Sequence, residues 1–132
     1  MRRFLNAYGR AATYASVVVA GTLALLEVAT DGWPGFDLLL LIPVVVVYVF
    51  PITLVLGLPI HLAFAAMKIQ SGASYIAAGL PLGATTAVVL FRGSGLAWLS
   101  VAALGFAAAG GVAALTFWRS YVDQSAGRLT SG

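Results

Sequence analysis

Three ionisable side chains stand out because each one interrupts a strongly apolar stretch of the chain: Glu27, His61 and Arg92. Glu27 is the acidic residue deepest in such a stretch, and it shares a helical face with Ala20 and Ala24. A carboxylate inside a membrane is costly and is by default a candidate proton or cation site. Glu27 also lies one turn from the outer end of its predicted span, where it reaches headgroups and water. We favour this second interpretation.

His61 is the only histidine, and it follows Pro59 in the first turn of a predicted helix near the cytoplasmic surface. Its imidazole is a candidate proton relay or axial haem ligand. A haem held by two histidines would need the second one from another chain, and a helix N-terminus disfavours the charged imidazolium. We therefore expect a neutral, hydrogen-bonding or interfacial role for His61, and no cofactor.

Two outer turns are predicted from clusters of breaker residues, at 31–35 and 92–95. We expect Arg92 to pair with Asp31, Asp37 or Glu27 and so to join these turns. A charge-swap pair would test this hypothesis.

Hydrolytic and metal chemistry has no sequence signal here. The chain has no cysteine, which excludes disulfides, thiolate metal sites and cysteine nucleophiles. It also has no GxSxG or HExxH motif and no phosphate-binding glycine loop. We expect a protein without enzymatic activity and without a metal site.

The elements that position these residues are long apolar segments. The chain has 132 residues, 61% hydrophobic and only 8% charged, whereas an average globular protein is roughly one quarter charged. That length accommodates about four crossings of ~20 residues with short loops. We predict one all-helical transmembrane domain, a four-helix bundle with spans at about 11–30, 36–56, 75–91 and 96–118, followed by a flexible tail at 119–132.

The second apolar segment is longer than one crossing requires, since it continues over residues 36–67. As one straight helix it would measure ~48 Å, and it would need a tilt near ~50°, beyond the usual range. Residues 57–59 supply a break, because Pro59 suits the first turn of a new helix. We therefore predict a short cytoplasmic-surface helix at about 60–70.

Basic residues indicate the orientation of the spans. In the predicted topology one side of the membrane receives all of them except Arg92, so both termini are expected in the cytoplasm of a bacterial inner membrane. The residues on that side are Arg2, Arg3, Arg10, Lys68, Arg119 and Arg128. They are scattered singly between apolar segments, so we expect no nucleic-acid partner.

Small residues are the expected contacts between helices, because apolar side chains give little drive for association inside lipid. Three predicted spans carry them at helical spacing. They are Ala12, Ser16, Ala20 and Ala24 in the first, Gly79, Gly83 and Ala87 in the third, and Gly105, Ala109 and Ala113 in the fourth. The second span lacks small residues and is expected to face lipid or a partner.

Two sets of residues resemble parts of known membrane-protein families. Ala24, Glu27, Val28 and Thr30 superficially resemble the first helix of small multidrug-resistance exporters. The acid of those exporters lies mid-membrane and the remaining spans do not match, so their function is not carried over.

A second set of residues lies in roughly the second half of the chain. It comprises Gly57, Leu58, Pro59, Ile60, His61, Tyr75, Gly79, Gly83, Trp118 and Arg119. This set resembles small four-span bacterial inner-membrane proteins of unassigned function. The resemblance implies the number of spans and no activity.

The function expected from the sequence is that of an accessory or assembly subunit, which packs against itself as a homo-oligomer or against a larger membrane complex. Few buried polar groups are predicted, whereas translocation paths normally retain several ionisable residues. The alternative is a small oligomeric transporter or channel for a proton-coupled or cationic solute, using Glu27 with Arg92 and His61. A third possibility is a lipid- or quinone-binding module under the helix at 60–70.

Overall fold

The structure is a computed structural model, and it describes residues 1–31, 37–124 and 127. All elements in the described residues are helical. They are α1 (Arg2–Asp31), α2 (Asp37–Ala66), α3 (Gly72–Leu90), α4 (Leu96–Phe117) and the π-helix η1 (Trp118–Asp123), which continues α4. Four helices are long and apolar enough to cross a membrane, which confirms the predicted all-helical class and the number of long apolar helices.

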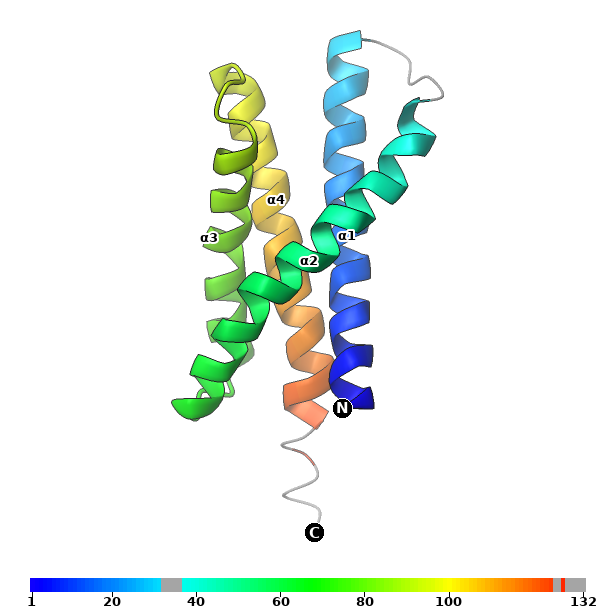
Figure 1. The fold of residues 1–132 in the computed structure, drawn as a ribbon. Coiled ribbons are helices and arrows are strands. Elements are labelled where there is room, and N and C mark those ends of the chain that lie inside the picture. The colour runs from blue at the N-terminus through cyan, green and yellow to red at the C-terminus, as the bar shows by residue number, and fades with distance from the viewer. Residues whose placement is uncertain (32–36, 125–126, 128–132) are drawn as a thin grey trace.

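The helices form a bundle in which α1, α3 and α4 stand side by side and α2 crosses them diagonally (Figure 1). α3 and α4 make the most extensive contact, followed by α1 with α4 and then α1 with α2, whereas α2 touches α3 little. α1 begins, α2 ends, α3 begins and α4 ends at one end of the bundle, here called the terminal end. The opposite end is called the far end.

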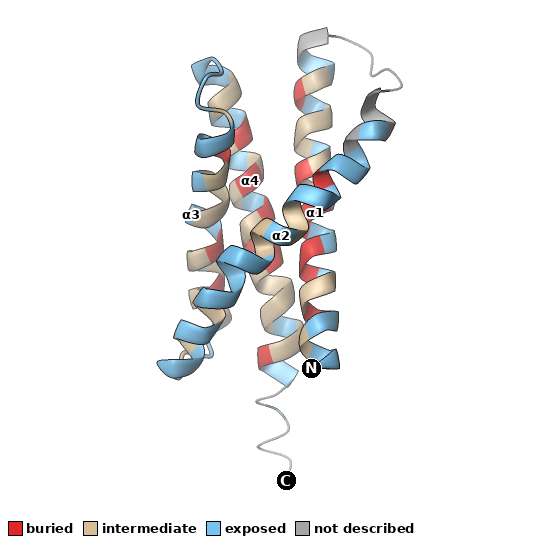
Figure 2. Ribbon diagram, in the orientation of Figure 1, coloured by how far each residue is buried: buried red, intermediate tan, exposed pale blue. Residues whose placement is uncertain are grey.

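The core of the bundle is built from small side chains. Ala11, Ala12, Ala87 and Ala102 are each at most 2% exposed, and Tyr75 and Phe106 are the two aromatic side chains buried with them. Buried positions lie mainly where α1, α3 and α4 face one another, while α2 is exposed along most of its length (Figure 2). α1 and α3 therefore pack closely on α4, and α2, whose residues 37–56 contain no glycine or alanine, lies outside them.

The second helix differs from its predicted form. α2 runs without a break through Gly57 and Pro59 to Ala66, so the predicted break at 57–59 and the separate helix at 60–70 were wrong. Each proline removes a single backbone donor, and a long apolar helix retains all its other intrahelical bonds. α2 remains one continuous helix and crosses the other three diagonally (Figure 1).

The helical segments at both ends of the chain are longer than expected. α1 begins at Arg2, so the residues before the predicted span at 11–30 form its first turns. At the other end η1 carries helical structure to Asp123, into the segment predicted as a flexible tail at 119–132. Burial explains this extension, because Val122 is 8% exposed and the ring of Tyr121 stacks on Phe117. Residues 125–126 and 128–132 lie outside the described part.

The end of α2 is a Schellman motif with lysine at the left-handed position. Lys68 has a φ of 56°, its backbone N–H donates to Ala65 O at 3.2 Å, and the N–H of Ile69 donates to Phe64 O at 2.8 Å. Glycine is the usual residue at this position because a Cβ disfavours the left-handed conformation.

Replacing Lys68 with glycine is therefore expected to stabilise the bundle by about 1 kcal/mol, through relief of this backbone strain. Denaturation of detergent-solubilised protein, followed by circular dichroism, measures the change. Lys68→Ala is the matched control, since it removes the same side chain and retains the Cβ. Equal stability of the two variants would contradict the strain argument.

Candidate functional site

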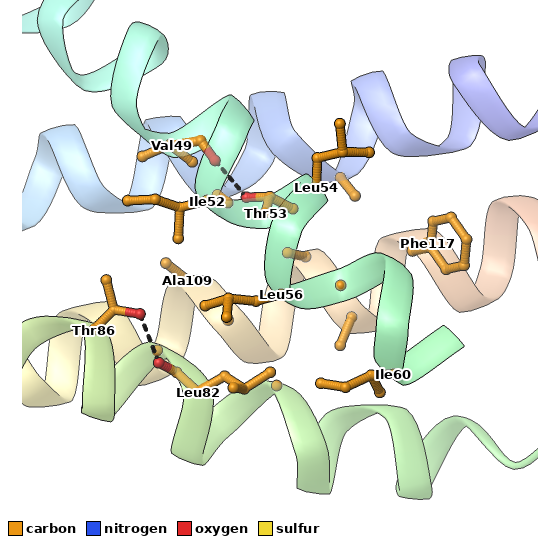
Figure 3. A pocket seen from close by; sticks show the side chains of 18 of the residues that line it. Val49, Ile52, Thr53, Leu54, Leu56, Ile60, Leu82, Thr86, Ala109 and Phe117 are labelled. Atoms are coloured by element: carbon orange, nitrogen blue, oxygen red, sulfur yellow. Dashed lines mark hydrogen bonds between the residues drawn. The ribbon is translucent and has the colours of Figure 1, made fainter. Parts of the chain in front are cut away.

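An apolar groove of about 150 Å³ lies in the terminal half of the bundle. All four helices line it: α1 from Phe4 to Val19, α2 from Val49 to Ile60, α3 from Tyr75 to Thr86, and α4 from Phe106 to Phe117. Figure 3 shows the side chains of α2 above the small residues of α3 and α4. We refer to this feature as the groove.

The groove follows from the packing of the helices. Ala15, Gly79 and Ala109 contribute short side chains to its lining, so α1, α3 and α4 leave a shallow floor. α2 presents mainly larger side chains such as Ile52 and Leu56 to the groove, and it contacts α3 little. Space therefore remains beneath it.

The hydroxyl groups in the groove are satisfied within the protein. Thr53 donates to Val49 O at 2.7 Å and Thr86 donates to Leu82 O at 2.8 Å, both within their own helices (Figure 3). The hydroxyl of Tyr8 donates to the carbonyl oxygen of α2 residue Phe50. The lining therefore offers hydrocarbon contacts and few polar ones.

An aromatic cluster around His61 closes the terminal end of the bundle. The His61 ring lies 5.0 Å from the ring of Phe117 and 5.3 Å from that of Tyr121, both edge-on, and 6.2 Å from that of Phe4. His61 Nδ1 and the hydroxyl of Tyr75 are joined by a hydrogen bond of 3.0 Å. We call these five residues the aromatic cluster. It brings together α1, α2, α3, α4 and η1.

The hydrogen bond between His61 and Tyr75 has a particular position in the fold. It joins α2 to α3, two helices that otherwise make little contact. Edge-to-face aromatic pairs add about 0.5–1.5 kcal/mol each beyond their buried area. The cluster therefore fixes the end of α2 against the bundle, and the groove begins immediately beside it, at Phe4, Tyr75 and Phe117.

Trp118 fixes the connection between α2 and α3. Its indole N–H donates to the carbonyl oxygen of Gln70 at 2.7 Å. Its ring lies so close to Gly72 that a Cβ there would come within 3.0 Å of it. These two contacts tie Trp118 of η1 to the α2–α3 connection.

The predicted ionisable residues do not form one site. Glu27 is half-buried near the end of α1 at the far end, whereas His61 lies at the terminal end. Arg92 is exposed in the turn between α3 and α4 and makes no ion pair within the described residues. Two of its predicted partners, Asp31 and Asp37, have side chains outside the described part.

The predicted packing residues lie at the helix interfaces to different degrees. A Cβ at Gly79 would overlap the carbonyl oxygen of Gly110, and one at Gly83 would overlap that of Phe106. A Cβ at Gly105 would overlap the side chain of Thr22 on α1. The remaining three are Ala109, which is 4% exposed, and Ala20 and Ala24, which are half-buried.

Sequence reasoning missed the groove and the grouping of the aromatic cluster around His61. Phe4, Tyr8 and Phe117 were not singled out, although each lies near one end of an apolar segment. Antiparallel spans place alternate segment ends at one level, so the shared depth of these aromatic residues was the available signal. The sequence did not indicate in which direction around its helix each of these aromatic side chains points.

Comparisons with models of protein families, with curated proteins and with solved structures gave no match. Among the described residues, no group of three or more His, Cys, Asp or Glu side chains is placed to hold a metal ion. The functional argument therefore depends on the groove, the aromatic cluster and the exposed side chains of α2.

Proposed function

We propose that this chain is a four-span protein of the bacterial inner membrane that acts without enzymatic activity, as an accessory or assembly subunit. It works by packing against a second copy or against a larger membrane complex. The observation that carries the proposal is the exposure of α2. Of its described side chains only Val45 is buried, while Val47 and Val55 are each 67% exposed.

The charge distribution supports the membrane placement. Of the described basic residues, Arg92 alone lies at the far end, and the others lie toward the terminal end. This asymmetry is typical of a protein with its terminal end in the cytoplasm. Together with the length and apolar composition of the four helices, it supports a bundle with both termini on the cytoplasmic side.

The placement of hydroxyl groups favours a packing role over transport. Seven serine and threonine side chains within the helices donate to the carbonyl four residues earlier, so these hydroxyl groups do not form a polar path. These residues are Thr13, Ser16, Thr22, Thr53, Thr85, Thr86 and Ser100. Glu27 and His61 lie at opposite ends of the bundle, which gives a proton or cation route no continuity.

Site-specific photo-crosslinking in intact membranes tests this proposal. A photoreactive residue at Val47 or Val55 on α2 is expected to give one discrete product of fixed mass. The matched controls are Val89 on α3 and Leu104 on α4, which are 63% and 73% exposed, and these are expected to give none. Equal crosslinking at all four positions, or at none, would remove α2 as a docking surface.

A further inference from the structure

We infer that the groove holds one acyl chain of an anionic phospholipid, whose headgroup lies among the basic residues of the terminal end. This inference rests on the membrane placement proposed above and adds a specific ligand to it. It depends on the size of the groove, on its lining and on the charge at its mouth.

The size of the groove selects a single hydrocarbon chain. An α-helix with its side chains is about 10–12 Å across and rises about 5.4 Å per turn. The volume of even one such turn exceeds the groove volume of about 150 Å³. Along α1 the lining extends from Phe4 to Val19, or about 22 Å at 1.5 Å per residue. One leaflet contributes about 15 Å of hydrocarbon. The groove therefore extends from headgroup level to the middle of the bilayer, as an acyl chain does.

The lining selects an apolar occupant. The hydroxyl groups of Tyr8, Thr53 and Thr86 donate to helix carbonyls, and the hydroxyl of Tyr75 is paired with His61. A ligand with a polar ring inside the groove would find few partners for its oxygen atoms, and burying such atoms unpaired is costly. A saturated or unsaturated acyl chain requires none.

The charge at the mouth selects an anionic headgroup. Arg2 and Arg3 begin α1, Arg119 lies in η1 and Lys68 follows α2, and all four side chains are exposed at the terminal end. A basic residue near an anionic membrane surface contributes about 1 kcal/mol of attraction. These cations complement a phosphate without a balancing ammonium group, such as that of phosphatidylglycerol.

The test is native mass spectrometry of the full chain in detergent micelles that contain phosphatidylglycerol or phosphatidylcholine. We expect the wild-type chain to retain one phosphatidylglycerol molecule and at least fivefold less phosphatidylcholine. Equal retention of the two lipids would overturn the assignment of the headgroup. Retention of neither, or a second copy of the chain in place of the lipid, would overturn the inference as a whole.

Two glycines allow a matched test of the groove itself. A Cβ at Gly57 or at Gly21 would meet nothing within 4 Å, but only Gly57 lines the groove. Gly57→Leu is expected to reduce retention of phosphatidylglycerol at least fivefold, and Gly21→Leu to leave it unchanged. Unchanged retention by Gly57→Leu would place the lipid elsewhere on the protein.

The basic residues allow a second test that leaves the groove intact. Combined replacement of Arg2, Arg3 and Arg119 with glutamine is expected to remove the preference for phosphatidylglycerol, while Arg92→Gln at the far end preserves it. A preference that survives the triple replacement would overturn the proposed headgroup site.

Membrane placement is tested separately by cysteine labelling. The native chain has no cysteine, so a single introduced cysteine is the only reactive thiol. Single cysteines at Ser71 and Ser94 lie at the terminal and far ends, and we expect them to react with an impermeant thiol reagent from opposite sides of the membrane. Reaction from the same side would overturn the proposed topology. The expected labelling without lipid retention would overturn the lipid inference alone.

Discussion

Replacing Gly83 with alanine is expected to destabilise the bundle by about 3 kcal/mol, the upper part of the range for overpacked cores. The added Cβ would overlap the carbonyl oxygen of Phe106 and would lie 3.0 Å from the Cα of Ala107. Both obstacles are backbone atoms of α4, so no change of rotamer relieves the overlap. α3 and α4 must separate, and their contact is the most extensive in the molecule.

Unfolding in mixed micelles of mild detergent and dodecyl sulfate, followed by circular dichroism, measures this loss. Gly21→Ala is the matched control, because its Cβ would meet nothing within 4 Å. A glycine inside a helix is about 1 kcal/mol less favourable than alanine, so this control is expected to gain stability. Equal shifts in the two variants would mean that helix propensity, and not contact between α3 and α4, determines the outcome.

The contact between α3 and α4 was accessible from the sequence because it depends on local spacing. Gly79 and Gly83 are four residues apart, and helical geometry places them on one face whatever the rest of the fold does. In lipid such a face is useful only against another backbone. The prediction of closely packed helices therefore needed no knowledge of the partner, although it did not identify Gly110 and Phe106 as the contacts.

The groove was not accessible in this way because it depends on the direction of α2. This helix is apolar around its whole circumference, so periodicity does not assign a face to the bundle. Residues 57–59 suggested a break, whereas α2 continues through them as one helix that crosses the bundle diagonally. The choice between these two solutions depends on contacts with α1 and on the aromatic cluster, which involve residues far apart in the chain.

The surroundings of His61 could not be predicted from the sequence either. His61 alone suggested a ligand or a proton relay, and its neighbours in sequence are apolar. The groups that surround it come from the other helices, with Phe4 before it in the chain and Tyr75, Phe117 and Tyr121 after it. These rings surround the imidazole, and its hydrogen bond to the hydroxyl of Tyr75 joins α2 to α3.

Phe117 is the residue through which the aromatic cluster is held together, and its replacement with alanine has the second large effect that we expect. Its ring lies within 6.4 Å of the rings of Phe4, His61, Tyr75 and Tyr121, measured between centroids. Removing a packed phenylalanine side chain costs about 3–5 kcal/mol in protein cores. Because Phe117 is only half-buried, we expect a loss of about 3 kcal/mol in the same unfolding experiment.

Two further variants separate packing in the cluster from the loss of apolar surface in general. Leu104 is 73% exposed on α4, and Leu104→Ala is expected to change stability by less than about 0.5 kcal/mol. Phe117→Leu retains most of the volume but not the ring contacts, and an intermediate loss of about 1 kcal/mol is expected. If Phe117→Ala were no worse than Leu104→Ala, α2 would be held by its contact with α1 alone. In that case the end of α2 would be free to move away from α3, and the groove would have no fixed mouth.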